Sequence, residues 1–341
     1  METKRYDETE LQEAAEALKE GELVAFPTET VYGLGANALL PNAVKKVFSV
    51  KGRPQDNPLI VHVASFEQVK EYVDNFHPAA EKIVKNFWPG PLTLIFKIKK
   101  DILPSVVTGG LSTAAFRIPD NKKTLEVIEL SGVPLVGPSA NTSGKPSPTT
   151  ADHVYHDLQG KITGIIDDGA TRIGVESTVL DLSDPTAMPM ILRPGAVTKE
   201  QIEAVIESPV AIDQHLVKEN ETPKAPGMKY KHYSPDTRVL MVRDGDWSTA
   251  VQWAKNKKIR AGVIASPEIA DQVRTDTAAV YMYNDNSVEA AAKGLFAGLR
   301  GLDEPTLGLD LIFVQVYPET GLGNAYMNRL KKAAGQNYFE K

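Results

Sequence analysis

A polar, proline-rich stretch divides this chain of 341 residues into two regions with different patterns of strands and helices. Four prolines, Pro209, Pro223, Pro226 and Pro235, interrupt any regular element there. Such a composition is typical of a linker between domains. We therefore expect a first domain over residues 1–207, a linker over 208–236 and a second domain over 237–341.

After the linker, strands and helices alternate strictly. The sequence predicts strands over residues 238–242, 262–265, 279–283 and 311–316. It predicts helices over residues 247–256, 267–273, 288–299 and 325–334. This alternation predicts a small parallel α/β domain of the doubly wound type.

The first region mixes strands and helices without that regularity. Strands are expected over residues 23–26, 59–63, 92–98, 114–118, 135–137, 164–167, 176–182 and 190–193. Helices are expected over residues 10–20, 41–50, 151–158 and 198–207, with helical stretches before Phe87. Thr9 is the expected N-cap of the first helix, and residues 27–37 are expected to form a loop. Several neighbouring strands predict an α/β fold with an open, twisted, mixed sheet.

Composition narrows the possible functions. The chain has no cysteine, which excludes disulfides, thiolate chemistry and cysteine-bound zinc. Its formal net charge of -6 argues against non-specific nucleic-acid binding as its main role. No apolar leader or membrane-length run is present, so a cytoplasmic protein is expected. His153 and His156 lack a third ligand, and we expect no metal site built by the protein.

Two short runs, Lys51-Gly52-Arg53 and Ser139-Ala140-Asn141, combine small residues with groups that hold anions. Cations on one loop, with a hydroxyl and an amide on another, suit a phosphate-bearing ligand. Each run also has a simpler interpretation, as a basic helix C-terminus or as a turn bonded by its own side chains. Because open α/β sheets bind ligands where strands end, we favour a site at the second run.

The glycine-rich segment over residues 27–38 contains a G-x-G-x-x-A pattern that begins at Gly33. In dinucleotide-binding proteins a strand leads directly into this pattern, whereas six residues separate it from the predicted strand here. We therefore reject a dinucleotide site. The alternative is a substrate-binding loop in which Thr30 and Tyr32 offer hydroxyl groups.

Further candidates lie at the ends of predicted strands. His62 interrupts an apolar strand and needs a polar partner there. Arg117 and Arg193 each end an apolar strand, and Ser177 lies at the start of another. Together with Lys51 and Arg53, these two arginines could hold a carboxylate and a polyphosphate.

Taken together, these runs resemble the YrdC-like threonylcarbamoyl-AMP synthases of the longer, two-domain Sua5 type. The resemblance covers nearly the whole chain. It is carried by residues 27–37, 51–59, 88–93, 116–119, 137–141, 177–178, 192–195, 225–228 and 232–235. It implies a YrdC-like catalytic domain followed by a smaller Rossmann-like parallel domain.

The resemblance also implies a reaction. A nucleotidyltransferase of this family forms threonylcarbamoyl-AMP and pyrophosphate from L-threonine, bicarbonate or CO2, and ATP with Mg2+. The product is passed to the tRNA threonylcarbamoyl transferase machinery, which makes the t6A modification. Direct contact with tRNA would be weak at most, and no membrane partner is implied.

The family's site residues carry over to this chain one by one. The resemblance places L-threonine at Thr30, His62, Arg117, Ser139 and Ser177. It places ATP at Arg53, Asn57, Thr113, Asn141, Ser147, Arg193 and Tyr233. Lys51 and Arg53 would be catalytic and face the phosphates. Because the mixed anhydride formed hydrolyses readily, we expect the linker with Tyr233 to act as a lid.

Two other functions remain open from sequence. YrdC-like domains are also associated with double-stranded RNA, so the chain could be an RNA-binding module without catalysis, although its acidic charge disfavours this. A related domain occurs in hydrogenase-maturation proteins that transfer carbamoyl groups. Those proteins carry a zinc-finger-like segment, which a chain without cysteine cannot form.

Overall fold

The computed structural model describes residues 2–213, 223–224 and 232–340. The family motif at residues 225–228 and much of the expected linker therefore lie outside the described residues. The chain divides into two compact units. Unit 1 comprises residues 1–143, 148–172 and 176–230, and unit 2 comprises residues 144–147, 173–175 and 231–341. Two short segments of the N-terminal region thus belong to unit 2.

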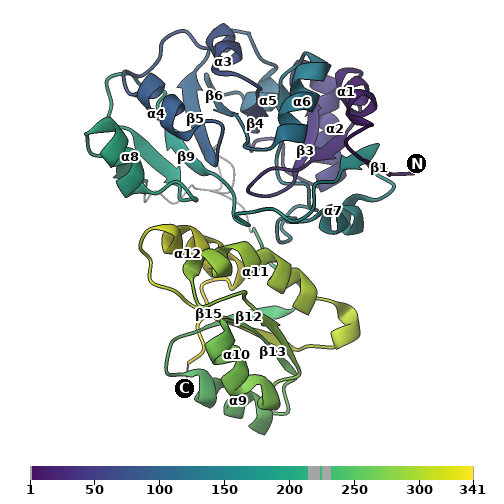
Figure 1. Ribbon diagram of the computed structural model, residues 1–341, viewed down its shortest axis with the longest axis vertical. Coiled ribbons are helices and arrows are strands. Elements are labelled where there is room, and N and C mark those ends of the chain that lie inside the picture. The colour runs from purple at the N-terminus through teal and green to yellow at the C-terminus, as the bar shows by residue number, and fades with distance from the viewer. Residues whose placement is uncertain (1, 214–222, 225–231, 341) are drawn as a thin grey trace. The chain divides into compact units, whose positions relative to one another are not determined.

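Unit 1 is built on a mixed sheet of 11 strands, in the order β1-β8-β2-β3-β7-β4-β6-β5-β9-β10-β11 (Figure 1). Its strands are β1 (Lys4–Tyr6), β2 (Val24–Phe26), β3 (Gly33–Asn37), β4 (Ile60–His62), β5 (Leu92–Lys97), β6 (Thr113–Arg117), β7 (Leu135–Val136), β8 (Gly164–Ile166), β9 (Thr178–Asp181), β10 (Met190–Arg193) and β11 (Ala211–Ile212). The mixed sheet predicted from the sequence is confirmed.

Helices cover the two faces of this sheet unequally. They are α1 (Leu11–Lys19), α2 (Pro41–Lys51), α3 (Phe66–Tyr72), α4 (Ala80–Phe87), α5 (Ser105–Thr108), α6 (Lys122–Ser131), α7 (Ala151–Leu158) and α8 (Lys199–Ile206). Helices α1 and α6 pack in one apolar cluster with β2, β7 and β8, while α2, α3, α4, α5, α7 and α8 share the main cluster. Alternate residues in and just before β2 serve both clusters. Val24 and Phe26 belong to the first, and Ala25 belongs to the second together with Leu23, which precedes the strand.

The expected loop over residues 27–37 is wrong in its second half, where Gly33–Asn37 form β3. This strand pairs antiparallel with β2 and β7, and all five of its residues are buried. A Cβ at Gly33 would come within 2.8 Å of the Phe26 ring, and one at Gly35 within 2.6 Å of the Val24 carbonyl oxygen. The glycines therefore permit a close strand pairing instead of a turn.

Three other expectations at the edges of unit 1 are also wrong. Strands β1 and β11, at the two edges of the sheet, were not predicted, because segments of three and two residues carry little periodicity. Thr9 does not cap α1, since its hydroxyl donates to Asp7, and Glu10 occupies the N-cap position.

Unit 2 contains four parallel strands in the order β12-β15-β13-β14, as the strand–helix alternation predicted. Its elements are β12 (Arg238–Val242), α9 (Trp247–Asn256), β13 (Ala261–Ala265), α10 (Pro267–Val273), η1 (Arg274–Asp276), β14 (Ala279–Met282), α11 (Val288–Leu302), η2 (Pro305–Leu307), β15 (Leu311–Gln315) and α12 (Leu322–Ala333). Helices α9 and α10 cover one face of this sheet, and α11 and α12 cover the other (Figure 1).

Among the described residues, no helix has the length and apolar character needed to cross a membrane.

Candidate active site

Neighbouring strands of unit 1 bring polar residues to one edge of the sheet, here the edge that is formed by the ends of its strands. In the order β4-β6-β5-β9-β10, strands β4, β6 and β10 run in one direction, and β5 and β9 run in the other. The ends of the first three strands therefore lie beside the starts of the other two. His62, Arg117 and Arg193 are the last residues of β4, β6 and β10. Thr93 and Ser177 lie at the starts of β5 and β9. Four predicted residues thus lie at one edge together with Thr93, which the sequence analysis did not single out.

A small apolar cluster accompanies these residues. It consists of Ile60, Ile95, Ala115, Val179 and Leu192, all from strands. Because side chains two residues apart in a strand share a face, Arg117 shares the face of Ala115. Thr113, the first residue of β6, also shares this face, about 13 Å from Arg117 along the strand. Thr113 therefore lies at the opposite end of the strand.

Arg117 is 4% exposed, and its guanidinium group is bonded to two other segments. Its Nε donates to the carbonyl oxygen of Gly90 at 3.2 Å, and its Nη1 donates to Oγ1 of Thr30 at 3.0 Å. Its Nη2 lies 2.7 Å from Oε2 of Glu29. The structure thus joins Thr30 and Arg117, two predicted threonine ligands, and adds Glu29, which was not predicted.

His62 is buried, as the sequence predicted, and lies opposite Arg117 in the β4–β6 register. Burial, together with the charge of Arg117, lowers the pKa of His62 to about 3, so the ring is neutral near pH 7. Its Nδ1 has no hydrogen-bond partner among the described residues. A Cβ at Gly137 would come within 2.7 Å of this nitrogen, so glycine is needed there.

Arg193 is 5% exposed and holds the turn before β9. Its Nε and Nη2 donate to the Ser177 carbonyl oxygen at 3.1 and 2.9 Å. Its Nη2 also donates to Oγ of Ser177 at 3.1 Å, and that hydroxyl lies 2.8 Å from Oγ1 of Thr93. Arg193, predicted for ATP, and Ser177, predicted for threonine, are therefore in direct contact.

The two runs singled out in the sequence meet in the structure. Lys51 is the last residue of α2, and only 2% of it is exposed. Its Nζ donates to the carbonyl oxygens of Ser139 and Asn141, 88 and 90 residues away in sequence. Since Ser139 is two residues beyond Gly137, the segment after β7 leads from the His62 ring to the Lys51 ammonium.

Two of the predicted ATP ligands follow Lys51. Nη2 of Arg53 donates to the carbonyl oxygens of Asn57 and Pro58 at 3.4 and 3.2 Å, which folds the loop before β4. Asn57 is buried, and its Oδ1 has no partner among the described residues. This amide oxygen is therefore an acceptor available to a ligand.

Ser147 and Tyr233 belong to unit 2. Both are buried, and Tyr233 has a φ of 64°, a conformation that non-glycine residues rarely adopt. Its ring lies 5.2 Å from that of Phe296. The backbone on either side of Ser147 is tied to this unit, because Arg300 donates to the Pro146 carbonyl oxygen.

The hydroxyl of Tyr32, which the sequence analysis offered to a substrate, is hydrogen-bonded within the protein. The hydroxyl donates to the carbonyl oxygen of Gly169 at 2.8 Å and accepts from the backbone N–H of Asp168 at 3.1 Å. Burial raises the pKa of Tyr32. Tyr32 therefore fastens the segment after β8 to the loop after β2.

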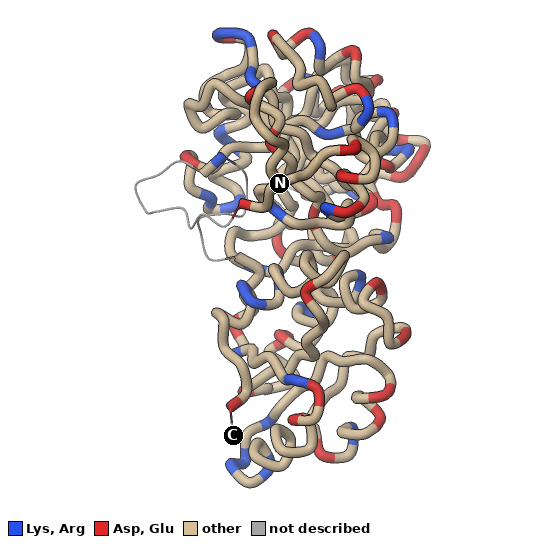
Figure 2. The backbone as a smooth tube through the Cα atoms, turned by 90° about the vertical axis from the view of Figure 1, so that its left-hand side faces the viewer, with Lys and Arg blue, Asp and Glu red and all other residues tan. Residues whose placement is uncertain are grey.

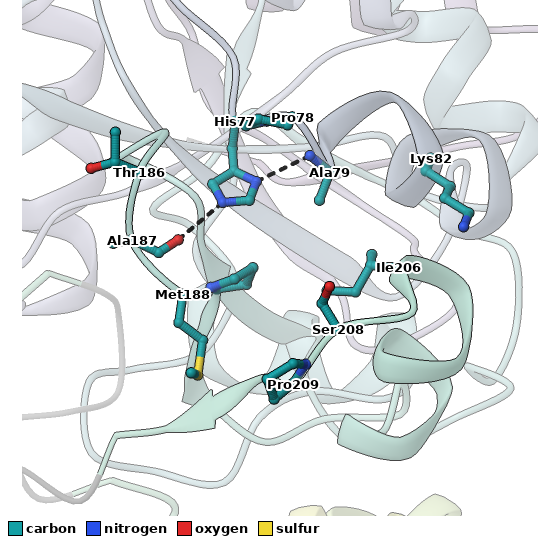
Figure 3. A pocket seen from close by; sticks show the side chains of 11 residues that line it. His77, Pro78, Ala79, Lys82, Thr186, Ala187, Met188, Ile206, Ser208 and Pro209 are labelled. Atoms are coloured by element: carbon teal, nitrogen blue, oxygen red, sulfur yellow. Dashed lines mark hydrogen bonds between the residues drawn. The ribbon is translucent and has the colours of Figure 1, made fainter.

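A cavity elsewhere in unit 1 contains none of the predicted site residues. It has a volume of about 460 Å³ and lies beside His77, between α4, the β9–β10 connection and the end of α8 (Figure 3). His77 accepts from the Ala79 backbone N–H through Nδ1 and reaches the Ala187 carbonyl oxygen, 3.0 Å away, through Nε2. Both ring nitrogens are engaged, so this histidine is structural.

Charged residues of both signs are interspersed in each unit, and no run of one sign dominates the described residues (Figure 2). A basic stripe would be expected on an RNA-binding module that works by phosphate contacts. The charge distribution therefore gives that alternative no support.

The chain matches two family models. A model described as "Telomere recombination" covers residues 16–195, and a model described as "Threonylcarbamoyl-AMP synthase, C-terminal domain" covers residues 197–335. A threonylcarbamoyl-AMP synthase from Bacillus subtilis is 48% identical over 96% of this chain and 94% of its own length. This chain belongs to the threonylcarbamoyl-AMP synthase family.

Other members of the family match equally far along the chain. The threonylcarbamoyl-AMP synthase of Pyrococcus abyssi is 48% identical over 97% of this chain and 96% of its own length. The crystal structure of P. abyssi Sua5 complexed with L-threonine superposes with a TM-score of 0.91. That structure is 45% identical and covers 100% of both chains.

Proposed function

We propose that this chain is an L-threonylcarbamoyladenylate synthase whose active site lies at the polar sheet edge of unit 1. It joins L-threonine, bicarbonate and ATP into threonylcarbamoyl-AMP and pyrophosphate, in the synthesis of the t6A modification of tRNA. We expect this chemistry in the cytoplasm, with the product passed on to the tRNA threonylcarbamoyl transferase.

The main support for this proposal is that unit 1 buries several positively charged side chains. Among the described residues, four lysine or arginine side chains are buried, and three of them, Lys51, Arg117 and Arg193, belong to unit 1. Buried cations are costly unless anions or hydrogen-bond acceptors compensate them. The three substrates bring a carboxylate, a bicarbonate and a triphosphate, which are the anions that such a site suits.

In this proposal threonine lies at the ends of β4 and β6. Arg117 receives its carboxylate, since a guanidinium matches a carboxylate in a planar, bidentate geometry. Hydroxyl groups of Thr30 and Ser177 offer hydrogen bonds to the rest of the amino acid. His62 is neutral at pH 7 because of its low pKa, so it adds a polar group without a second charge.

ATP would occupy the Lys51 side of the site. Carboxylated threonine is an anionic nucleophile, so its oxygen attacks the α-phosphorus without a general base on the protein. A P–O bond forms as the bond to pyrophosphate breaks, and an in-line arrangement of the two is required. Lys51, fixed by its two carbonyl partners, and Arg53 would stabilise the charge on the phosphates.

Mg2+ is proposed to enter with ATP. No group of three histidine, aspartate or glutamate residues in the described part of the chain is placed to hold a metal ion. The cations of this site suit phosphates instead, and Mg2+ usually keeps several waters and binds through substrate phosphates. When bound, the ion would neutralise part of the phosphate charge.

The test is pyrophosphate release from ATP by the purified chain without RNA. We expect release only when threonine and bicarbonate are both present, together with a product of the mass of threonylcarbamoyl-AMP. Omission of each substrate in turn is the control. Pyrophosphate release that does not depend on threonine, or no release at all, would contradict the proposal. If there is no release, binding of RNA by the chain would favour the RNA-binding alternative.

A further inference from the structure

Glu29 is a buried acid to which neither the sequence nor the proposed mechanism assigns a role. It lies in the loop after β2, and 3% of it is exposed. Its Oε2 is 2.7 Å from Nη2 of Arg117. Apart from this ion pair, neither of its carboxylate oxygens has a hydrogen-bond partner among the described residues. Buried carboxylates are rarely left in this condition without a function.

The positive charge of Arg117 explains why it pairs with Glu29. A guanidinium as buried as that of Arg117 needs a compensating anion, because an unpaired buried charge is strongly destabilising. Its other two contacts, to Gly90 and Thr30, are with uncharged oxygens. His62 is neutral at pH 7 and, if protonated, would repel Arg117. In the absence of substrate, Glu29 is therefore the anion that balances Arg117.

Glu29 also borders a cavity that none of the proposed threonine ligands lines. It lines a cavity of about 210 Å³ together with Thr28, Asp168 and Thr171. Oγ1 of Thr171 is a second buried oxygen there without a partner among the described residues. The residues that line this cavity do not include Arg117 or Thr30. Glu29 thus contacts Arg117 and also borders a separate space.

We propose that Glu29 is the positioning residue of the threonine site. It holds Nη2 of Arg117 and balances its charge, so that the guanidinium keeps one orientation toward the incoming carboxylate. This role rests on the proposed binding of threonine by Arg117. Thr30 and Gly90 fix Nη1 and Nε, and Glu29 completes the set.

The first test is Glu29→Gln, which preserves size and an acceptor oxygen but removes the charge. We expect the KM for threonine to rise at least tenfold while the KM for ATP stays within twofold of wild type. Asp120→Asn is the matched control, because Asp120 lines the same cavity but pairs with Arg172 at the surface. Equal increases in both KM values, or an unchanged KM for threonine, would overturn the proposal.

The second test is chemical rescue of Glu29→Ala. Truncation opens space beside the existing cavity, where formate can replace the missing carboxylate. We expect formate to lower the raised KM for threonine at least threefold, with chloride at the same ionic strength having no effect. A purely structural role predicts no rescue, and a raised KM that formate leaves unchanged would count against the proposal. If Glu29→Ala does not fold, the result for Glu29→Gln alone decides whether the proposal stands.

Arg117→Lys separates this inference from the proposed site. If Arg117→Lys leaves the KM for threonine unchanged, Arg117 does not bind threonine, and the role of Glu29 fails with it. If Arg117→Lys raises that KM and Glu29→Gln does not, the threonine site stands and only the positioning role is wrong.

Discussion

Units 1 and 2 both bury polar side chains, but they differ in how these groups are paired. In unit 2, Tyr283 and Tyr326 are buried, with their hydroxyls 2.9 Å apart, and Tyr326 donates to the Gln315 carbonyl oxygen at 2.6 Å. In unit 1, the described residues provide no hydrogen-bond partner for Oδ1 of Asn57 or Nδ1 of His62, and in unit 2 they provide none for Nε1 of Trp247. Unpaired buried groups are costly, and at the proposed site a ligand could complete the two groups of unit 1.

The largest effect is expected for Lys51→Met, which removes the ammonium but keeps most of the chain length. Threonine-dependent pyrophosphate release should fall by about 100- to 1000-fold, the usual loss when one fixed electrostatic group is removed. Lys46→Met is the control, because Lys46 lies on the same helix and forms a surface ion pair with Glu22. Activity within threefold of wild type would show that Lys51 serves only to fasten the 139–141 turn.

Acid should destabilise unit 1 through His62. The folded pKa of about 3 lies below the unfolded value of 6.5, so only the unfolded chain takes up this proton between those values. The stabilisation is thus complete above pH 6.5 and is lost as the pH falls, by about 1.4 kcal/mol per unit. Urea unfolding of wild type and His62→Gln between pH 7.5 and 5 measures the difference. Equal pH dependence in the two proteins would contradict the buried neutral histidine.

In unit 2, the buried pair Tyr283 and Tyr326 is expected to affect stability and not activity. Tyr326→Phe leaves the Gln315 carbonyl oxygen without its donor and should destabilise the protein by about 1–3 kcal/mol. Calorimetry should show the loss, while kcat/KM for threonine and ATP stays within twofold. A large loss of activity without a loss of stability would break the comparison between the units.

The smallest effect is expected for Asn57→Ala. Because Oδ1 of Asn57 has no partner among the described residues, its removal should cost less than about 1 kcal/mol of stability. The KM for ATP should rise about tenfold, which corresponds to about 1.4 kcal/mol. Asn86→Ala, in an exposed helical position, is the control and should leave both quantities unchanged. A stability loss without a change in the KM for ATP would make Asn57 a structural residue.

Some of this structure could be predicted from local patterns. The second domain was predictable because a parallel sheet covered on both faces requires strands and helices to alternate, and each is apolar with its own period. Strand β3 was not predictable, because its glycines are typical of a turn. Only the structure shows that the Phe26 ring and the Val24 carbonyl oxygen leave no room for a side chain there. Thr93 was missed for a related reason: a threonine in an apolar strand has no local sign of a contact with Ser177.

The sequence by itself determined the chemistry that the chain can perform. Its motif residues identify the family, and the positions of Lys51, Arg117 and Arg193 at element ends mark them as anion-binding candidates. Only the tertiary structure decided which of these residues meet. The order β4-β6-β5-β9-β10 is not the order of the chain, and it brings His62 and Arg193 to one edge across 131 residues of sequence. Strand order follows from how the two faces pack, as does the pairing of Glu29 with Arg117, and neither is encoded in any local run of residues.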